Sequence, residues 1–195
     1  MGGRLRQPCF HSPQMKFGAV APKDSFLTEY NPFPGGKYLW LLVPAVLITA
    51  ADLWTKHLAM AELPLNEGIF ITDFFNLVHV RNMGAAFGFL NDPSTPWAAR
   101  LFLGATVVAV AVIVWIARSA RSRAFVLALG LILGGAVGNA VDRARFGAVV
   151  DFLDFHYNGM HWPAFNVADI GICVGAGLAA LCILFGADGK TPEKQ

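Results

Sequence analysis

Four stretches of this chain are apolar over a length that would cross a lipid bilayer, and they constrain its fold more than any other feature. They cover residues 38–58, 97–117, 124–141 and 163–185. A helical span needs about 20 mostly apolar residues. Of the 195 residues, 55% are hydrophobic and 14% are charged, which is too few charges to cover a soluble domain of this length. The sequence therefore predicts an all-α membrane protein with four transmembrane helices.

The lysines and arginines are distributed unevenly among the segments outside these spans, and this predicts the orientation. One set precedes the first span, fills the turn between the second and third spans and follows the fourth: Arg4, Arg6, Lys16, Lys23, Lys37, Arg118, Arg121, Arg123, Lys190 and Lys194. Basic residues are enriched on the cytoplasmic side of membrane proteins. We therefore expect both termini in the cytoplasm and residues 59–96 and 142–162 on the outer face.

The chain is expected to divide into three parts. Residues 1–36 contain no apolar core of the kind found in a secretory signal peptide, and they predict a flexible cytoplasmic tail. Residues 37–187 are predicted to form the four-helix domain. Residues 188–195 then form a second cytoplasmic tail.

The connection between the first two spans, about residues 60–96, is dense in β-branched and aromatic residues. It contains the run IFITDFFNLVHVRNMGAAFGFLNDP, in which apolar and polar residues partly alternate. Such a composition is typical of strands. We expect a small extracytoplasmic β-rich domain between helices one and two, and a folded loop that only covers the helices is the alternative.

The end of this region, RNMGAAFG, combines one amide side chain with several small residues. Gly84 has no side chain, so the backbone can approach another chain closely, and Asn82 presents both a donor and acceptors. The pattern is consistent with the close approach of another chain. Ordinary tight packing against a helix also explains it.

Several common kinds of site are not encoded. Cys173 and Cys182 lie on one predicted helix with a rotation of about 900° between them, so they point to opposite faces. The chain contains no CxxC, HExxH, GxSxG or Walker spacing. We therefore expect no metal site, no serine or nucleotide chemistry and no nucleic-acid partner.

Three polar residues lie at the outer end of the third span. Asn139, Asp142 and Arg143 follow the spacing i, i+3 and i+4, so they share one helix face. For Asp142 and Arg143, a structural ion pair with other polar groups is the favoured explanation.

Two further aspartates are placed where ionisation is costly. Asp151 is flanked by Val150 and Phe152, and a carboxyl group among apolar residues near lipid resists ionisation. Asp169 opens the last apolar run, with Asn166 one turn before it on the same helix face. Two carboxyl groups brought together share a proton, so one can take a proton from water while the other polarises a peptide carbonyl. This is the chemistry of an aspartic protease, and a proton or ion pathway is the main alternative.

Five sequence blocks together resemble lipoprotein signal peptidase, also called signal peptidase II. They are DLWTK, NMGAAFG, GGAVGNAVDR, GAVVDF and FNVAD, and they occur in this order within residues 38–186. The resemblance implies an aspartic endopeptidase of the bacterial cytoplasmic (inner) membrane, which removes the signal peptide of prolipoproteins by cleaving before a diacylglyceryl-modified cysteine. It also implies no metal or organic cofactor, contact with membrane lipids, and inhibition by the substrate mimic globomycin.

The resemblance also implies roles for individual residues. Asp151 and Asp169 match the catalytic pair, and Asp52 and Lys56 match a block with a structural role. The residues that match groups supporting the site or binding the substrate are Asn82, Gly84, Asn139, Asp142, Arg143 and Asn166.

Two other classes of protein fit parts of the pattern. A proton-coupled transporter would use Asp142, Asp151 and Asp169 as a proton path, but the inner halves of spans two to four contain no matching acids. A non-enzymatic assembly factor would not need two convergent aspartates with supporting asparagines. The peptidase is therefore the favoured function.

Overall fold

The structure, a computed structural model, describes residues 36–84 and 97–186, and four long helices account for most of them. The helices are α1 (Lys37–Glu62), α2 (Trp97–Ser119), α3 (Arg123–Phe146) and α4 (Val167–Leu184). Each is long and apolar enough to cross a membrane. The predicted four-helix membrane fold is confirmed. The predicted tails, apart from residue 36, lie outside the described residues.

Among the helix ends that differ from the prediction, the end of α3 and the start of α4 are explained by local hydrogen bonds. α3 continues beyond residue 141 to Phe146 and ends where Gly147 adopts a left-handed conformation, with a φ of 70°. α4 begins only at Val167 because Asn166 caps it. The Asn166 side chain accepts a hydrogen bond from Asp169 N, and the Asp169 side chain accepts one from Asn166 N. Asn166 therefore precedes the helix and does not share a helix face with Asp169.

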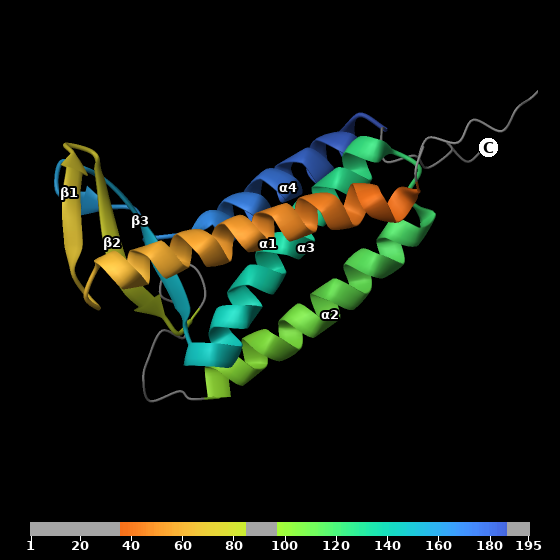
Figure 1. Ribbon diagram of the computed structural model, residues 1–195. Coiled ribbons are helices and arrows are strands. Elements are labelled where there is room, and N and C mark those ends of the chain that lie inside the picture. The colour runs from red at the N-terminus through yellow and green to blue at the C-terminus, as the bar shows by residue number, and fades with distance from the viewer. Residues whose placement is uncertain (1–35, 85–96, 187–195) are drawn as a thin grey trace, which may run out of the picture. The chain divides into compact units, whose positions relative to one another are not determined.

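A four-stranded antiparallel sheet, in the order β1-β2-β3-β4, lies at one end of the helices (Figure 1). β1 (Gly68–Thr72) and β2 (Phe75–Asn82) come from the connection between α1 and α2, where the β-rich region was predicted. β3 (Val149–Tyr157) and β4 (Met160–His161) come from the connection between α3 and α4. The sheet is thus assembled from two connections that are far apart in the sequence.

The pairing of β2 with β3 joins these two connections. Val80 pairs with Asp151 and Asn82 pairs with Val149, after a bulge that interrupts the register between Leu77 and Val80. Residues opposite each other on paired strands lie close together. The register therefore brings Asn82 next to Asp151, although 69 positions separate them in the sequence.

α3 packs against all three other helices, and glycines let the backbones approach closely. A Cβ atom at Gly134 would lie 2.5 Å from the Ala45 carbonyl oxygen of α1, and one at Gly135 would overlap the Ala168 carbonyl oxygen of α4. Real Cβ atoms do not come so close to backbone oxygens, so only glycine fits at these positions. α3 is accordingly the most buried of the four spans.

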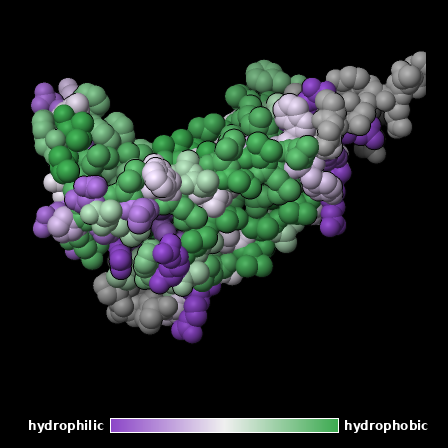
Figure 2. Space-filling view, in the orientation of Figure 1, coloured by the Kyte–Doolittle hydropathy of each residue, from purple (hydrophilic) through white to green (hydrophobic). Residues whose placement is uncertain are grey.

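The outward faces of the helices are apolar. Val46, Val107 and Trp115 are among the large hydrophobic side chains that remain exposed. Figure 2 shows hydrophobic residues over most of the visible face of the helices, with hydrophilic residues collected near the helix ends. In a bilayer these apolar side chains face acyl chains, so their exposure is expected of a membrane-spanning fold.

Gly175 and Gly177 of α4 provide a test of the close packing. A Cβ atom at Gly175 would lie 2.7 Å from the Ala128 carbonyl oxygen of α3, whereas one at Gly177 would meet nothing within 4 Å. We expect Gly175→Ala to lower the free energy of unfolding by about 1–3 kcal/mol, as overpacking does. Gly177→Ala should leave it unchanged or raise it by up to about 1 kcal/mol. Thermal unfolding of both variants in the same detergent measures these changes. Equal changes in stability for Gly175→Ala and Gly177→Ala would contradict the close packing at Gly175.

Candidate active site

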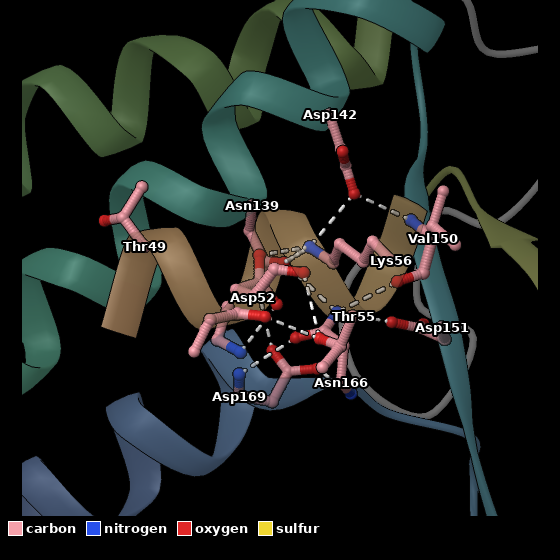
Figure 3. A network of polar contacts seen from close by, with 12 residues as sticks. Thr49, Asp52, Thr55, Lys56, Asn139, Asp142, Val150, Asp151, Asn166 and Asp169 are labelled. Atoms are coloured by element: carbon pink, nitrogen blue, oxygen red, sulfur yellow. Dashed lines mark hydrogen bonds and ion pairs between the residues drawn. The ribbon is translucent and has the colours of Figure 1, made fainter. Parts of the chain in front are cut away.

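A buried lysine lies at the end of the helices that faces the sheet. Lys56 of α1 is 1% exposed. Its Nζ atom lies 2.8 Å from Asp52 Oδ2, 2.9 Å from Asp142 Oδ2 and 2.9 Å from Asn139 Oδ1 (Figure 3). An ammonium group has three protons to donate, and each has an acceptor here. The ion pair expected for Asp142 is therefore present, with Lys56 as its partner.

Both carboxylates of this cluster also bind a backbone group. Asp142 Oδ2 accepts a hydrogen bond from Val150 N at 3.1 Å, and Asp52 Oδ1 accepts one from Ala168 N at 2.8 Å. Val150 and Ala168 each stand immediately before one member of the predicted aspartate pair. The charge of Lys56 thus anchors, through two carboxylates, the backbone on which both of those aspartates are carried.

The Asn166 side chain connects the two predicted aspartates. Its Nδ2 atom donates a hydrogen bond to Asp151 Oδ1 at 2.7 Å, and its Oδ1 atom accepts one from Asp169 N at 3.0 Å. The same Nδ2 atom lies 3.2 Å from Asn139 Oδ1 and 3.2 Å from Val150 O. Asn166 is fully buried. This one amide therefore sets the position of β3 relative to the start of α4.

Asp169 lies in the first turn of α4 and is half-buried. Its Oδ1 atom accepts a hydrogen bond from Asn139 Nδ2 at 2.8 Å, and its Oδ2 atom accepts one from Asn166 N at 3.3 Å. The oxygen of the Asn139 amide faces Lys56, and its nitrogen faces Asp169. The lysine charge therefore polarises the amide that binds Asp169. The positive end of the helix dipole also favours a carboxylate at this place.

Asp151 lies in β3 and is 3% exposed. Burial raises its pKa, and the nearby charge of Asp169 raises it further. Hydrogen bonds from Asn82 Nδ2, at 3.2 Å, and from Asn166 offset part of this effect, which leaves the pKa at about 7. Near neutral pH, protonated and ionised forms of Asp151 are therefore both populated.

Arg143 does not form the ion pair expected from the sequence. No ion pair of Arg143 occurs among the described residues, and the adjacent Asp142 is paired with Lys56. Its Nη2 atom instead donates a hydrogen bond to Gly84 O at 2.9 Å, and Gly84 N donates one to Asn82 Oδ1 at 3.0 Å. The expectation is corrected accordingly: Arg143 fixes a backbone turn, and that turn orients the Asn82 amide toward Asp151.

Part of this polar network lines one cavity of about 810 Å³. Its polar wall consists of Arg81, Asn82, Gly84, Asn139, Arg143, Asp151 and Asp169. Much of the remaining wall is apolar and comes from the segment 162–165 and from Ile170 and Val174 of α4. Largely apolar cavities with a few convergent polar groups are typical of binding and active sites.

Part of the cavity wall was not predicted from the sequence. Val80, Arg81, Trp162 and Phe165 line it, although none of them was given a role in the site. Strand pairing places them there: for example, Phe165 N donates a hydrogen bond to Leu153 O. Phe165 opens the block FNVAD, and for the other three the only sequence signal was proximity to this block or to NMGAAFG. Residues 85–88 of the block NMGAAFG lie outside the described residues.

Asp154 lies outside this cavity although it follows Asp151 by three positions. Its carboxylate accepts a hydrogen bond from Asn76 Nδ2 at 2.9 Å and lies 2.9 Å from His161 Nδ1. Burial acts to raise the pKa of Asp154, but the hydrogen bonds from His161 and Asn76 outweigh it and hold the pKa below its usual value. Asp154 therefore connects β2, β3 and β4 as an ionised group.

Two solved structures, each described as a bacterial membrane enzyme, share this fold. The first is 26% identical in sequence, with a TM-score of 0.67 over 84% of this chain and 96% of that chain. The second is 27% identical, with a TM-score of 0.65 over 78% of this chain and 94% of that chain. The arrangement of four helices with an antiparallel sheet is thus that of known membrane enzymes.

The sequence is similar to one family along most of its length. The chain is 53% identical to the lipoprotein signal peptidase of Oleidesulfovibrio alaskensis over 141 residues, which are 71% of this chain and 90% of that protein. It is 50% identical to that of Nitratidesulfovibrio vulgaris over 145 residues, or 73% of this chain and 88% of that protein. The family model described as Signal peptidase (SPase) II matches residues 44–185, a range that contains the whole polar wall of the cavity. This chain therefore belongs to the signal peptidase II family.

Proposed function

We propose that Asp151 and Asp169 are the catalytic pair with which this peptidase removes the signal peptide of prolipoproteins, cutting just before a cysteine that carries diacylglycerol. The observation that carries the assignment is that both carboxyl groups line one cavity and both bind Asn166, Asp151 through the side-chain amide and Asp169 through the backbone N–H. Among the described residues, no other carboxyl group lines that cavity. The relatives, which are lipoprotein signal peptidases, support the substrate class.

In the proposed mechanism the pair holds one proton before the substrate reacts. Because its pKa is raised to about 7, a fraction of Asp151 is still protonated near neutral pH, and this form donates the proton to the carbonyl oxygen of the scissile peptide bond. Asp169 takes a proton from a water molecule as the water oxygen bonds to the carbonyl carbon. The product of this step is a tetrahedral diol, with Asp151 ionised and Asp169 protonated.

The second step breaks the peptide bond. Asp169 gives its proton to the nitrogen of the leaving cysteine, the C–N bond breaks, and Asp151 takes a proton from one hydroxyl group of the diol. The signal peptide leaves with a new carboxyl group, the lipoprotein leaves with a free amino group, and the pair returns to its starting protonation. Asn82, Asn139 and Arg143 hold the two carboxyl groups and the neighbouring backbone in place during these transfers.

The depth of the site supports a lipid-anchored substrate. The cavity lies where α4 begins and where β3 follows α3, so it is near the ends of membrane-spanning helices. The distribution of basic residues supports cytoplasmic termini and, with them, a site at the outer face of the bacterial cytoplasmic membrane. Two acyl chains on one cysteine would hold the scissile bond at the depth of the lipid headgroups. The apolar wall formed by α4 suits a signal peptide or a mimic of it such as globomycin.

Exchange of either aspartate for asparagine tests the catalytic pair. We expect Asp151→Asn and Asp169→Asn each to lower kcat by about 10²–10⁴-fold, because each removes a proton-transfer group. Asp154→Asn is the matched control: it alters a carboxylate three positions from Asp151 but outside the cavity, and it should retain most of the activity. Cleavage of a lipid-modified prolipoprotein by the purified variants provides the measurement. Near-normal turnover by either the Asp151→Asn or the Asp169→Asn variant would refute the mechanism.

The raised pKa of Asp151 predicts a pH dependence of stability. A carboxyl group whose pKa is higher in the folded protein stabilises the fold when it is protonated, and this contribution is lost as the pH rises from about 4 to about 7. Asp151→Asn cannot ionise, so its unfolding temperature should fall less over this range than that of the unchanged protein. Asp154 has a lowered pKa, and Asp154→Asn should instead lose stability at neutral pH. Identical pH profiles for the unchanged protein and Asp151→Asn would contradict the assignment.

The lipid on the substrate provides a third test. Without diacylglycerol, the scissile bond loses acyl anchoring of about 0.8 kcal/mol per buried CH₂ group. The unmodified precursor should therefore be cleaved far more slowly than the modified one at equal concentration, and globomycin should block cleavage of the modified one. Mass spectrometry of both precursors after incubation in the same vesicles measures this. Equal rates would leave an intramembrane aspartic peptidase with no preference for lipidated substrates.

A further inference from the structure

Two arginines at the sheet end of the helices have no role in the mechanism described above. Arg81 lies in β2 and Arg145 in the last turn of α3, and both are exposed. Within residues 36–84 and 97–186, neither of them forms an ion pair. Lys56 and Arg143, by contrast, are engaged within the site. Because basic residues are depleted on the outer side of membrane proteins, two unpaired arginines at this end need an explanation.

The two guanidinium groups share one aromatic ring. The Cζ atom of Arg81 lies 4.9 Å from the centroid of the Phe146 ring, and the Cζ atom of Arg145 lies 5.1 Å from it. The Phe146 ring therefore contacts one guanidinium group from the sheet and one from the end of a helix. Two like charges near each other repel, and a bound anion removes this repulsion. The arrangement is suited to an anionic group.

The position of these side chains in the fold indicates which kind of anion they meet. Phe146 is the last residue of α3, a helix long enough to span a membrane. Arg81 pairs across the sheet with Val150 and also lines the cavity. Figure 2 shows hydrophilic residues where the helices meet the sheet, with hydrophobic surface on both sides of them. Cations at the end of a membrane span lie at the depth of the lipid phosphates.

We propose that Arg81 and Arg145 bind the phosphate group of an anionic phospholipid at the edge of the active-site cavity. Guanidinium groups bind phosphate oxygens through paired N–H donors, and both of these groups lie against the Phe146 ring. A lipid is the chosen ligand because its phosphate lies at this depth while its acyl chains cover the apolar faces of the helices. The bound lipid fixes the height of the cavity relative to the headgroups.

This lipid site goes beyond the proposed function and does not depend on which residues are catalytic. It depends only on the membrane location of the helix ends. A failure of the Asp151 or Asp169 assignment in cleavage assays would leave it intact, because its test measures lipid binding and not turnover.

The test compares lipid selectivity among arginine variants of the full chain. The protein is placed in nanodiscs that contain phosphatidylglycerol and phosphatidylcholine, and the relative affinity for spin-labelled forms of the two lipids is measured. Arg81→Gln and Arg145→Gln are studied singly and together, beside a double exchange of both arginines for lysine. Arg100→Gln is the matched control, since Arg100 is an exposed arginine in the first turn of α2 outside the Phe146 cluster and the cavity lining.

We expect the unchanged protein to prefer phosphatidylglycerol, and each exchange to glutamine to reduce this preference by up to about fivefold. The lysine variant should keep part of the preference, because it keeps the charge but not the paired donors. Arg100→Gln should match the unchanged protein. Equal selectivity of the unchanged protein and the double glutamine variant would overturn the proposal. Binding of inorganic phosphate in lipid-free detergent, as tight as that of the lipid, would overturn the choice of a lipid.

Discussion

The buried ammonium group of Lys56 is the interaction on which the rest of the site depends. A charge that is 1% exposed requires partners, and Asp52 and Asp142 supply them. Each of these carboxylates also binds the backbone N–H that precedes one member of the proposed catalytic pair. Breaking a buried pair by removing one partner costs about 3–5 kcal/mol, so the cluster keeps α1, α3, β3 and the start of α4 in one arrangement. The segments that carry the two aspartates are therefore both held, through these two carboxylates, by the same lysine.

Asparagines, and not further charges, connect this cluster to the catalytic groups. An amide has both a donor and an acceptor, so Asn139 can accept from Lys56 and donate to Asp169 without adding charge. Asn166 links Asp151 to the start of α4 in the same way. A cation in direct contact with Asp151 would lower its pKa, whereas neutral amides leave it raised to about 7. The pKa of Asp154 is shifted in the opposite direction, because the hydrogen bonds from His161 and Asn76 hold it below its usual value.

The combination of a membrane bundle with a small sheet suits an enzyme that removes signal peptides from prolipoproteins. α4 supplies an apolar wall for a substrate that arrives within the bilayer, and β2 and β3 supply polar groups at the membrane surface. The proposed catalytic pair lies where these two surfaces meet, with Asp151 on the sheet and Asp169 on the helix. The arginines around Phe146 add a cationic edge to the same place. The proposed catalytic pair and the proposed lipid site therefore lie at one junction between helices and sheet.

The sequence by itself determined the four spans, the strand-forming region after the first span and most of the polar residues that the structure brings together. Apolar length and residue type are local properties, so these could be read directly and strengthened by the family resemblance. Only the tertiary structure decided how the residues are combined: that Asp142 pairs with Lys56 while Arg143 binds Gly84 O, that Asn166 caps α4, and that both connections contribute strands to one sheet. Strand register and helix packing join residues far apart in the chain, and no local pattern specifies which partner a buried charge will find.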